Sequence, residues 1–238
     1  PGLGKTLLVR ALARCFGGES CRIQFTPDLM PTDVTGHAVF NMQSGEFEVR
    51  KGPVFTNLLL ADEINRAPAK TQAALLEVMQ ERQVTIEGRP FAVAEPFMVL
   101  ATQNPIEQDG TYPLPEAELD RFMMKVLIDY PDEPAEFNLV RDRTLDKIGD
   151  RLDVEDLQQL LSAQDVLDLQ VVCAKVTVDD AVLDYAVRVC RQTRVESGLL
   201  LGAGPRATLA LVRSARARAV LEDRDFVIPD DVKSMVPA

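Results

Sequence analysis

The chain has 238 residues, which is enough for one large domain or for a large and a small one. Its 46% hydrophobic and 26% charged residues are ordinary for a globular protein, and no apolar run approaches the length needed to cross a bilayer. The net charge of −11 argues against tight, nonspecific binding to a nucleic-acid backbone.

Cysteine and histidine usage argues against a metal site built from those residues. The four cysteines lie far apart and none forms a CxxC pair, so neither a disulfide framework nor a zinc site is indicated. His37 is the single histidine, which excludes a site with several histidine ligands. We therefore expect reduced, mostly buried thiols and a cytoplasmic location.

The first half of the chain alternates apolar runs with helical patterns, as the βα units of a parallel sheet do. A helical repeat follows the opening glycines directly, and a second helix is predicted to begin at Pro68. The continuous apolar run at 57–61 is typical of a strand that is covered on both faces. In chain order, the strands that we predict cover residues 22–25, 57–61, 97–101 and 123–128.

Two interruptions of this pattern resemble β-hairpins. Residues 39–49 alternate around Ser44-Gly45, and residues 84–93 alternate around Glu87-Gly88-Arg89. After Pro134 the pattern becomes wholly helical. Three helices are predicted there, marked by Leu157, Leu160 and Leu161, by Val182, Ala186 and Val189, and by Pro205, Leu209 and Val212.

The charge distribution changes where the helical pattern takes over. Between Asp129 and Asp184 there are 15 Asp and Glu against 5 Lys and Arg, a local balance of −10, whereas Arg188 to Arg224 is rich in arginine. We therefore predict an α/β core over residues 1–130 and a small all-α domain over residues 131–238.

The opening sequence Pro-Gly-Leu-Gly-Lys-Thr has the residue types of a P-loop. In such a loop, backbone N–H groups converge on phosphates, a lysine reaches the outer phosphate oxygens, and a hydroxyl binds Mg²⁺. Gly2, Leu3 and Gly4 would supply the backbone, Lys5 the charge and Thr6 the hydroxyl. Gly-Lys-Thr alone is equally compatible with a turn before a helix.

Two acids end the apolar run Leu58 to Ala61. Asp62 would hold the magnesium ion and Glu63 would polarise an attacking water molecule. A pair of solvated acids at a strand end is the alternative for this motif by itself. The combination with the opening Gly-Lys-Thr favours the catalytic interpretation.

Three further residues are candidates for contact with phosphate oxygens. Asn104 follows the third strand, where a polar side chain could reach both the water and the terminal phosphate, and Thr102 is a weaker candidate nearby. Arg121 precedes the fourth predicted strand, and Arg206 begins a helix. For Asn104 the alternative is an ordinary Asn-Pro turn. For each arginine the alternative is a surface position, and Arg206 could also simply be paired with an acid.

Three segments carry a resemblance to a known family. They are LLLADEINRAPAKTQAALLEVMQERQVTIEG, VLATQNPIEQDGTYPLPEAELDRF and GAGPRATLALVRSARARA. They resemble the Walker B, sensor 1, arginine-finger and sensor 2 segments of MoxR-type AAA+ ATPases. The similarity covers essentially the whole chain.

The resemblance implies a P-loop NTPase αβα core with a helical lid, which uses ATP and Mg²⁺ and assembles into a ring, usually of six subunits. Lys5 and Thr6 match the Walker A pair, Asp62 and Glu63 the Walker B pair, and Asn104 sensor 1. Arg121 matches the finger that reaches a neighbouring subunit, and Arg206 matches sensor 2, acting on its own or the adjacent site.

The family also implies a chaperone-like task, in which partner proteins are remodelled, matured or loaded with metal. Many members work with a protein that carries a von Willebrand factor A domain. The two hairpins match the helix 2 insert and the pre-sensor 1 hairpin, which usually face the pore or a partner. We expect the family's first strand, the first P-loop glycine and the last lid elements to be absent from this chain.

Two other functions are compatible with the same motifs. A DNA motor could share the second hairpin, but the turn of this hairpin offers only Arg89 beside Glu87, and the chain is acidic, so a nucleic-acid partner is disfavoured. A non-hydrolysing, nucleotide-gated scaffold is the other alternative. The intact Asp62-Glu63 pair and the two arginines argue against it.

Overall fold

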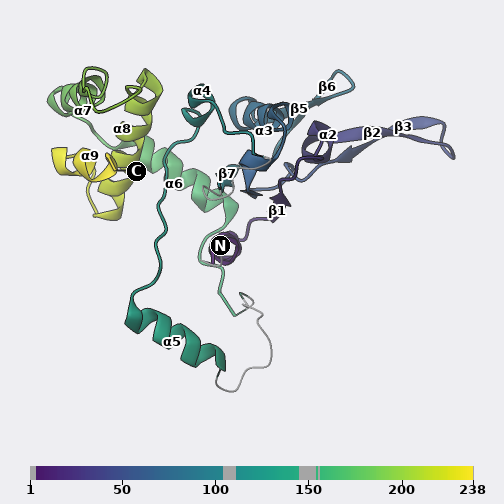
Figure 1. Ribbon diagram of the computed structural model, residues 1–238, viewed down its shortest axis with the longest axis horizontal. Coiled ribbons are helices and arrows are strands. Elements are labelled where there is room, and N and C mark those ends of the chain that lie inside the picture. Colours follow the sequence, from purple (N-terminus) through teal and green to yellow (C-terminus); the bar gives the residue numbers. More distant parts are fainter. Residues whose placement is uncertain (1–3, 104–110, 145–153, 155, 238) are drawn as a thin grey trace.

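The computed structural model describes residues 4–103, 111–144, 154 and 156–237 (Figure 1). The elements of the first half are α1 (Lys5–Cys15), β1 (Ser20–Gln24), α2 (Pro31–Thr35), β2 (Gly36–Asn41), β3 (Glu46–Lys51), β4 (Leu58–Asp62), a 3₁₀ helix (Ile64–Arg66), α3 (Ala69–Glu81), β5 (Gln83–Ile86), β6 (Arg89–Ala92) and β7 (Met98–Ala101). Then follow α4 (Glu116–Leu119), α5 (Glu133–Thr144), α6 (Ala163–Lys175), α7 (Asp180–Gln192), α8 (Pro205–Leu221) and α9 (Pro229–Met235).

A parallel sheet with the strand order β1-β4-β7 forms the centre of the first half. The strands predicted at 22–25, 57–61 and 97–101 are confirmed, with boundaries shifted by one or two residues. β4 is the central strand, and its residue Leu59 lies opposite Cys21 of β1 and Val99 of β7. Within the described residues, the outer edge of β7 has no strand partner.

The apolar run of β4 is continuous because both faces of the sheet are covered. Leu58 and Leu60 belong to a buried cluster that includes residues of α1. Leu59 and Ala61 point to the opposite face, where they share the largest buried cluster with Leu75 of α3. Successive side chains of a strand alternate between faces, so α1 and α3 cover the two sides of one sheet, as in an αβα sandwich.

Both predicted hairpins are confirmed. β2 and β3 pair antiparallel around a turn in which Gly45 has a φ of 71°. β5 and β6 pair around Glu87 and Gly88, whose φ values are 48° and 73°. Two successive positive φ angles match the twist of a two-residue hairpin, and glycine adopts them at little cost. The two hairpins extend to the same side of the molecule, away from α7, α8 and α9 (Figure 1).

The strand predicted over Met123 to Ile128 is wrong. This segment is extended but forms no ladder with any described strand, and its apolar side chains are exposed, with Val126 and Leu127 at 68% and 74%. An apolar run becomes a strand only where a neighbouring strand supplies hydrogen-bond partners, and the described part of the chain has none beside it.

The helix predicted around Leu157 to Leu161 is also wrong. The N–H groups of Leu160 and Leu161 donate to the carbonyl of Cys15 at the end of α1, which holds this segment in a non-helical conformation. The helix begins at Ala163, because Ser162 and Asp165 form a reciprocal capping box.

The helices after residue 162 have a separate buried cluster. Ala186 of α7 and Ala215 and Ala219 of α8 are fully buried, with Val232 of α9 beside them. The helices predicted around Val182 and from Pro205 are thus confirmed as α7 and α8. α6 packs against α8, while α5 stands apart with its described side chains exposed (Figure 1).

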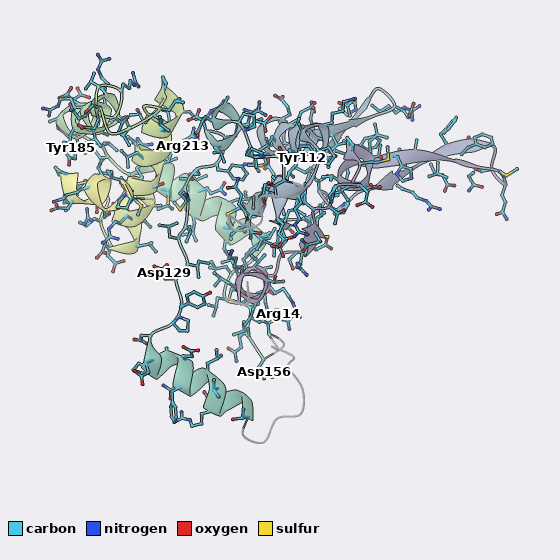
Figure 2. All side chains as sticks on the ribbon, in the orientation of Figure 1. Arg14, Tyr112, Asp129, Asp156, Tyr185 and Arg213 are labelled. Atoms are coloured by element: carbon cyan, nitrogen blue, oxygen red, sulfur yellow. The ribbon has the colours of Figure 1, made fainter. Side chains whose placement is uncertain are left out.

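None of the helices in the described ranges is long and apolar enough to cross a membrane. The extended stretch that contains Asp129 leads from α4 to α5 (Figure 2). The division into a core over 1–130 and a lid over 131–238 stays a prediction.

Candidate functional site

The acidic pair lies at the carboxyl end of the central strand. Asp62 is the last residue of β4, and Glu63 follows in the left-handed conformation with a φ of 56°. This turn redirects the chain into the 3₁₀ helix over Ile64–Arg66. Because parallel strands end at the same edge of a sheet, the ends of β1, β4 and β7 bring side chains together here.

Both carboxylate oxygens of Asp62 accept hydrogen bonds. The hydroxyl of Thr102, just after β7, donates to Oδ1 at 2.5 Å. On the other side, Arg22 of β1 donates to Oδ2 from Nη2 at 2.6 Å and from Nε at 3.1 Å. The side chain of Asp62 is 18% exposed, so it remains accessible from solvent.

The surroundings of Asp62 keep it ionised. Burial raises the pKa of the Asp62 carboxyl and is the largest single influence, but the hydrogen bonds of Thr102 and Arg22 and the charges of Arg22 and Lys5 together hold that pKa below its ordinary value. The charge of Lys5 is the weakest of these influences. α1, which begins at Lys5, packs on the face of β4 that carries Leu58 and Leu60.

Glu63 belongs to the same polar network. Its Oε2 atom accepts a hydrogen bond from Gln24 Nε2 at 2.9 Å and pairs with Arg66 Nε at 3.1 Å. Its backbone N–H donates to the Thr102 hydroxyl at 2.9 Å. Gln24 Oε1 in turn accepts from Arg22 Nη2 at 2.9 Å, which links the two acids through β1.

The start of α1 supplies the remaining candidate ligands. Gly4 has a φ of 73° and immediately precedes Lys5 and Thr6 in the first turn. Among the described residues beyond its chain neighbours, no atom lies within 4 Å of a Cβ built on Gly4, so the positive φ is what favours glycine there. Gly2, Leu3 and Asn104 lie outside the described residues. Thr102, the weaker of the two candidates after β7, makes the observed contacts with the acidic pair.

The two candidate arginines lie near one another. Arg206 Nη1 is 3.7 Å from Asp120 Oδ2, and Asp120 is the residue before Arg121. Pairing with an acid, the alternative for Arg206, is therefore observed. In the described part of the chain, no hydrogen bond or ion pair joins Arg121 or Arg206 to Asp62 or Glu63.

The donor set at this edge suits a magnesium ion that is shared with a phosphate. Asp62 offers an ionised carboxylate, and Thr6 carries a hydroxyl in the first turn of α1. Among the described residues there is no group of three or more His, Cys, Asp or Glu side chains that could hold a metal by itself. Mg²⁺ typically takes one or two carboxylates and completes its shell with water and substrate phosphates, so this sparse set fits it.

The sequence interpretation missed Arg22 and Gln24. Both lie in a segment that was predicted as a strand, and two polar residues two positions apart share one face of that strand. A parallel strand beside β4 has to end at the same edge as Asp62. That geometric rule could have identified both residues as members of the site.

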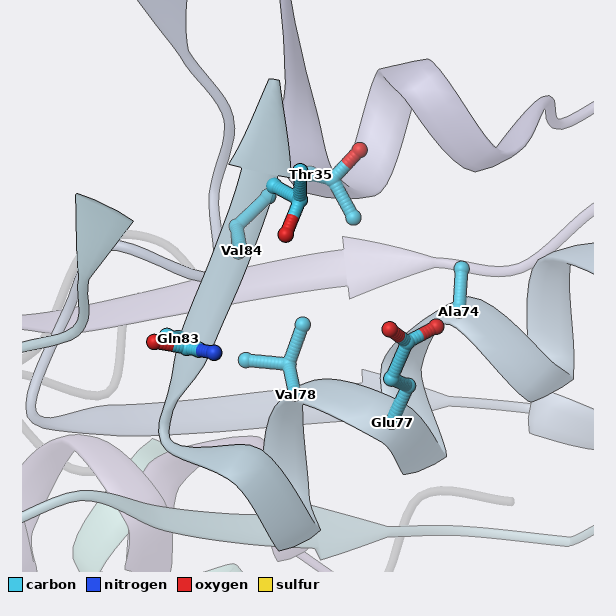
Figure 3. Close-up of a pocket in the computed structure, with 7 residues that line it drawn as sticks. Thr35, Ala74, Glu77, Val78, Gln83 and Val84 are labelled. Carbon is cyan, nitrogen blue, oxygen red and sulfur yellow. The ribbon is translucent and has the colours of Figure 1, made fainter. Parts of the chain in front are cut away.

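The described residues also form hollows away from this edge. A partly open cavity of about 190 Å³ lies between α2, α3 and β5, with Thr35, Glu77 and Gln83 around it (Figure 3). A larger hollow of about 500 Å³ separates the hairpins. It is lined by Ala38, Glu46, Phe47, Val49, Ile86, Glu87 and Arg89. Neither contains residues from the carboxyl ends of β1, β4 and β7.

Family models match both halves of the chain. Residues 1–124 match the ATPase family associated with various cellular activities (AAA), and residues 191–238 match the AAA lid domain. A crystal structure from Cytophaga hutchinsonii, described as that of a candidate ATPase, superimposes with a TM-score of 0.86 at 45% identity, covering 98% of this chain and 72% of that one. The chain thus belongs to the AAA family of ATPases and has the P-loop NTPase fold.

Curated relatives narrow this class. The uncharacterized protein YeaC of Bacillus subtilis is 46% identical over all of this chain and 72% of its own length. Chaperone MoxR1 of Mycobacterium tuberculosis is 48% identical over all of this chain and 63% of its own length. Protein MoxR of Methylorubrum extorquens is 33% identical over 99% of this chain and 74% of its own length. Within the AAA ATPases, the chain is of the MoxR type.

Proposed function

We propose that this chain binds ATP with Mg²⁺ and hydrolyses it at the edge where β1, β4 and β7 end. The observation that carries the proposal is the Asp62-Glu63 pair at the end of the central strand, where Thr102 and Arg22 hold both carboxylate oxygens of Asp62. Gly2, Leu3, Gly4 and Lys5 would hold the phosphates. Thr6 and Asp62 would hold the magnesium ion, which would neutralise phosphate charge.

In this proposal the remaining residues stabilise the reacting groups. Glu63 orients and polarises the attacking water, and Asn104 contacts the water and the terminal phosphate. Arg121 and Arg206 provide positive charge for the transferred phosphoryl group, Arg121 from a neighbouring subunit.

Replacement of Lys5 tests nucleotide binding directly. Lys5→Ala in the full-length protein removes the charge that would reach the outer phosphate oxygens, so we expect affinity for a fluorescent ATP analogue to fall at least about tenfold. Lys70→Ala, which removes the same charge from the exposed first turn of α3, is the matched control. Unchanged affinity in the Lys5 variant would reject the P-loop assignment.

We further propose that hydrolysis drives the remodelling, maturation or metal loading of partner proteins. Chaperone MoxR1 is among the relatives, and a tobacco magnesium-chelatase subunit ChlI is 25% identical over 76% of this chain. The hollow between the hairpins is lined by the exposed Phe47 and other apolar side chains together with charged ones, and we propose that it receives a client.

We also propose that the subunits assemble into a ring of six and that the ring works with a partner that carries a von Willebrand factor A domain. Light scattering with and without nucleotide measures the assembly, and co-purification from the source cell identifies the partner. A protein that stays monomeric at all concentrations with bound nucleotide would contradict the ring. A cytoplasmic location remains a prediction from the sequence.

A further inference from the structure

Asp62 already has a cationic partner in this structure. Two nitrogens of the Arg22 guanidinium donate to Oδ2, while Thr102 donates to Oδ1. Thr102 is neutral, so Arg22 is the group in direct contact that balances the carboxylate charge. Its position is fixed by the register of the sheet, in which β1 lies directly beside β4 and Gln24 is opposite Asp62.

We propose that Arg22 is an internal counterion of Asp62 that leaves this carboxylate when Mg²⁺ and nucleotide bind. Arg22 would then set how strongly nucleotide binding depends on Mg²⁺. The inference rests on the proposed function, because it takes Asp62 as the magnesium carboxylate. It adds a residue of β1 that opposes metal binding.

Arg22 and Mg²⁺ compete for Asp62 because both are positively charged. A divalent cation beside Asp62 would lie within a few ångströms of the guanidinium that now contacts the same carboxylate. Like charges at such distances repel each other strongly in a partly buried site. Lys5 adds a further positive charge nearby. Movement of Arg22 away from Asp62 removes the closest of these repulsions.

The exposure of Arg22 allows it to move. Its side chain is 50% exposed, and its only other described side-chain bond is to Gln24. An ion pair at such a position is weak, because water solvates the released guanidinium almost as well as the carboxylate does. The pair can therefore form without metal and open without disturbing the buried clusters.

The test compares nucleotide affinity with and without metal. A fluorescent, non-hydrolysable ATP analogue is titrated into the full-length protein in saturating Mg²⁺ and in EDTA, and the ratio of the two dissociation constants gives the gain due to Mg²⁺. We expect Arg22→Ala to increase this gain by about three- to tenfold, the size expected for an exposed pair with charged hydrogen bonds. A loss of nucleotide affinity that does not depend on Mg²⁺ affects both titrations equally and cancels in the ratio.

Two variants separate the counterion role from other effects. Arg22→Lys keeps the charge and should leave the gain close to wild type, and Arg50→Ala removes an exposed arginine of β3 and should not change it. An unchanged or smaller gain in Arg22→Ala, with nucleotide still bound, overturns the inference and leaves the proposed function intact. Wild-type protein that binds no nucleotide under either condition overturns both. If Arg22→Ala fails to fold, Arg22→Gln replaces it, with the same outcomes.

Discussion

At the scale of single residues, the two acids at the end of β4 have different environments. Asp62 is fixed through both carboxylate oxygens by Thr102 and Arg22, which suits a residue that holds a cation in one place. Glu63 is held through one oxygen, Oε2, by Gln24 and Arg66. Its other oxygen has no hydrogen bond with a described residue, so it is the one available to a water molecule.

Replacement of Glu63 by glutamine should separate binding from hydrolysis. Glu63→Gln keeps the size of the side chain but removes the carboxylate that orients and polarises water. We expect phosphate release to fall by about 10²- to 10⁴-fold while the affinity for ATP changes less than about threefold. Glu77→Gln, an exposed glutamate of α3, is the matched control and should behave as wild type. Turnover of Glu63→Gln within a few-fold of wild type would reject the catalytic role.

At the scale of elements, a sequence pattern predicted a strand correctly where the fold supplies neighbouring strands and helices that pack against it. The run Leu58 to Ala61 predicts β4 correctly, because complete apolarity requires cover on both faces and α1 and α3 provide it. The run at Met123 to Ile128 is also mostly apolar, but it has no strand beside it in the described residues. Strand formation depends on partners that a local pattern does not contain.

The same limit applies to the site. Lys5, Thr6, Asp62 and Glu63 could be predicted from motifs, because their chemistry depends on residues adjacent in sequence. Arg22 and Gln24 belong to no such motif, because their contacts with the acids depend on the pairing of β1 with β4, and only the rule that parallel strands end at one edge points to them.

The cap of α9 provides a prediction about stability. Asp231 is 2% exposed, accepts from the N–H of Ile228 at 2.9 Å and receives two hydrogen bonds from Arg224 at 2.6 and 2.8 Å. Asp231→Asn should lower the free energy of unfolding at neutral pH by about 2–3 kcal/mol, because it leaves Arg224 without its anion. Urea denaturation measures this change. Asp230→Asn, an exposed acid in the same turn, is the control.

The effect of Asp231 should depend on pH. The hydrogen bond from Arg224 is the main reason that the pKa of Asp231 lies below its ordinary value. The group therefore stabilises the fold fully above the ordinary pKa of about 4, and this stabilisation is lost as the pH falls through the lower folded-state pKa. The difference between wild type and Asp231→Asn should shrink under these acidic conditions. A constant difference across that range would show that the ionised carboxylate is not the stabilising form.

At the scale of the whole molecule, the start of α8 contacts the segment that ends the α/β half. Arg206 pairs with Asp120, and a Cβ built on Gly204 would lie 3.7 Å from Oδ1 of Asp120. The neighbouring Arg121 forms no side-chain hydrogen bond or ion pair with any described residue. An arginine in this situation is available to a second subunit, which is what the trans role of Arg121 requires.

We predict that hydrolysis depends on Arg121 from a neighbouring subunit. Arg121→Ala should lower ATPase activity by about 10³- to 10⁵-fold, as loss of an arginine finger does in related nucleotide hydrolases, because the transition-state charge is then incompletely stabilised. Lys5→Ala should also be inactive, because its own P-loop is defective. A head-to-tail contact that closes into a ring places the finger of each subunit at the site of the next.

Mixing these two inactive variants tests the trans role. In a random, equal mixture, about a quarter of the interfaces pair an intact P-loop from an Arg121→Ala subunit with an intact finger from a Lys5→Ala subunit. ATPase activity should therefore return to a substantial fraction of the wild-type rate, with light scattering confirming that mixed rings have formed. If Arg121 serves the site of its own subunit, every site in the mixture lacks one group and no activity returns. Assembled mixed rings that remain at background activity would thus exclude the trans role.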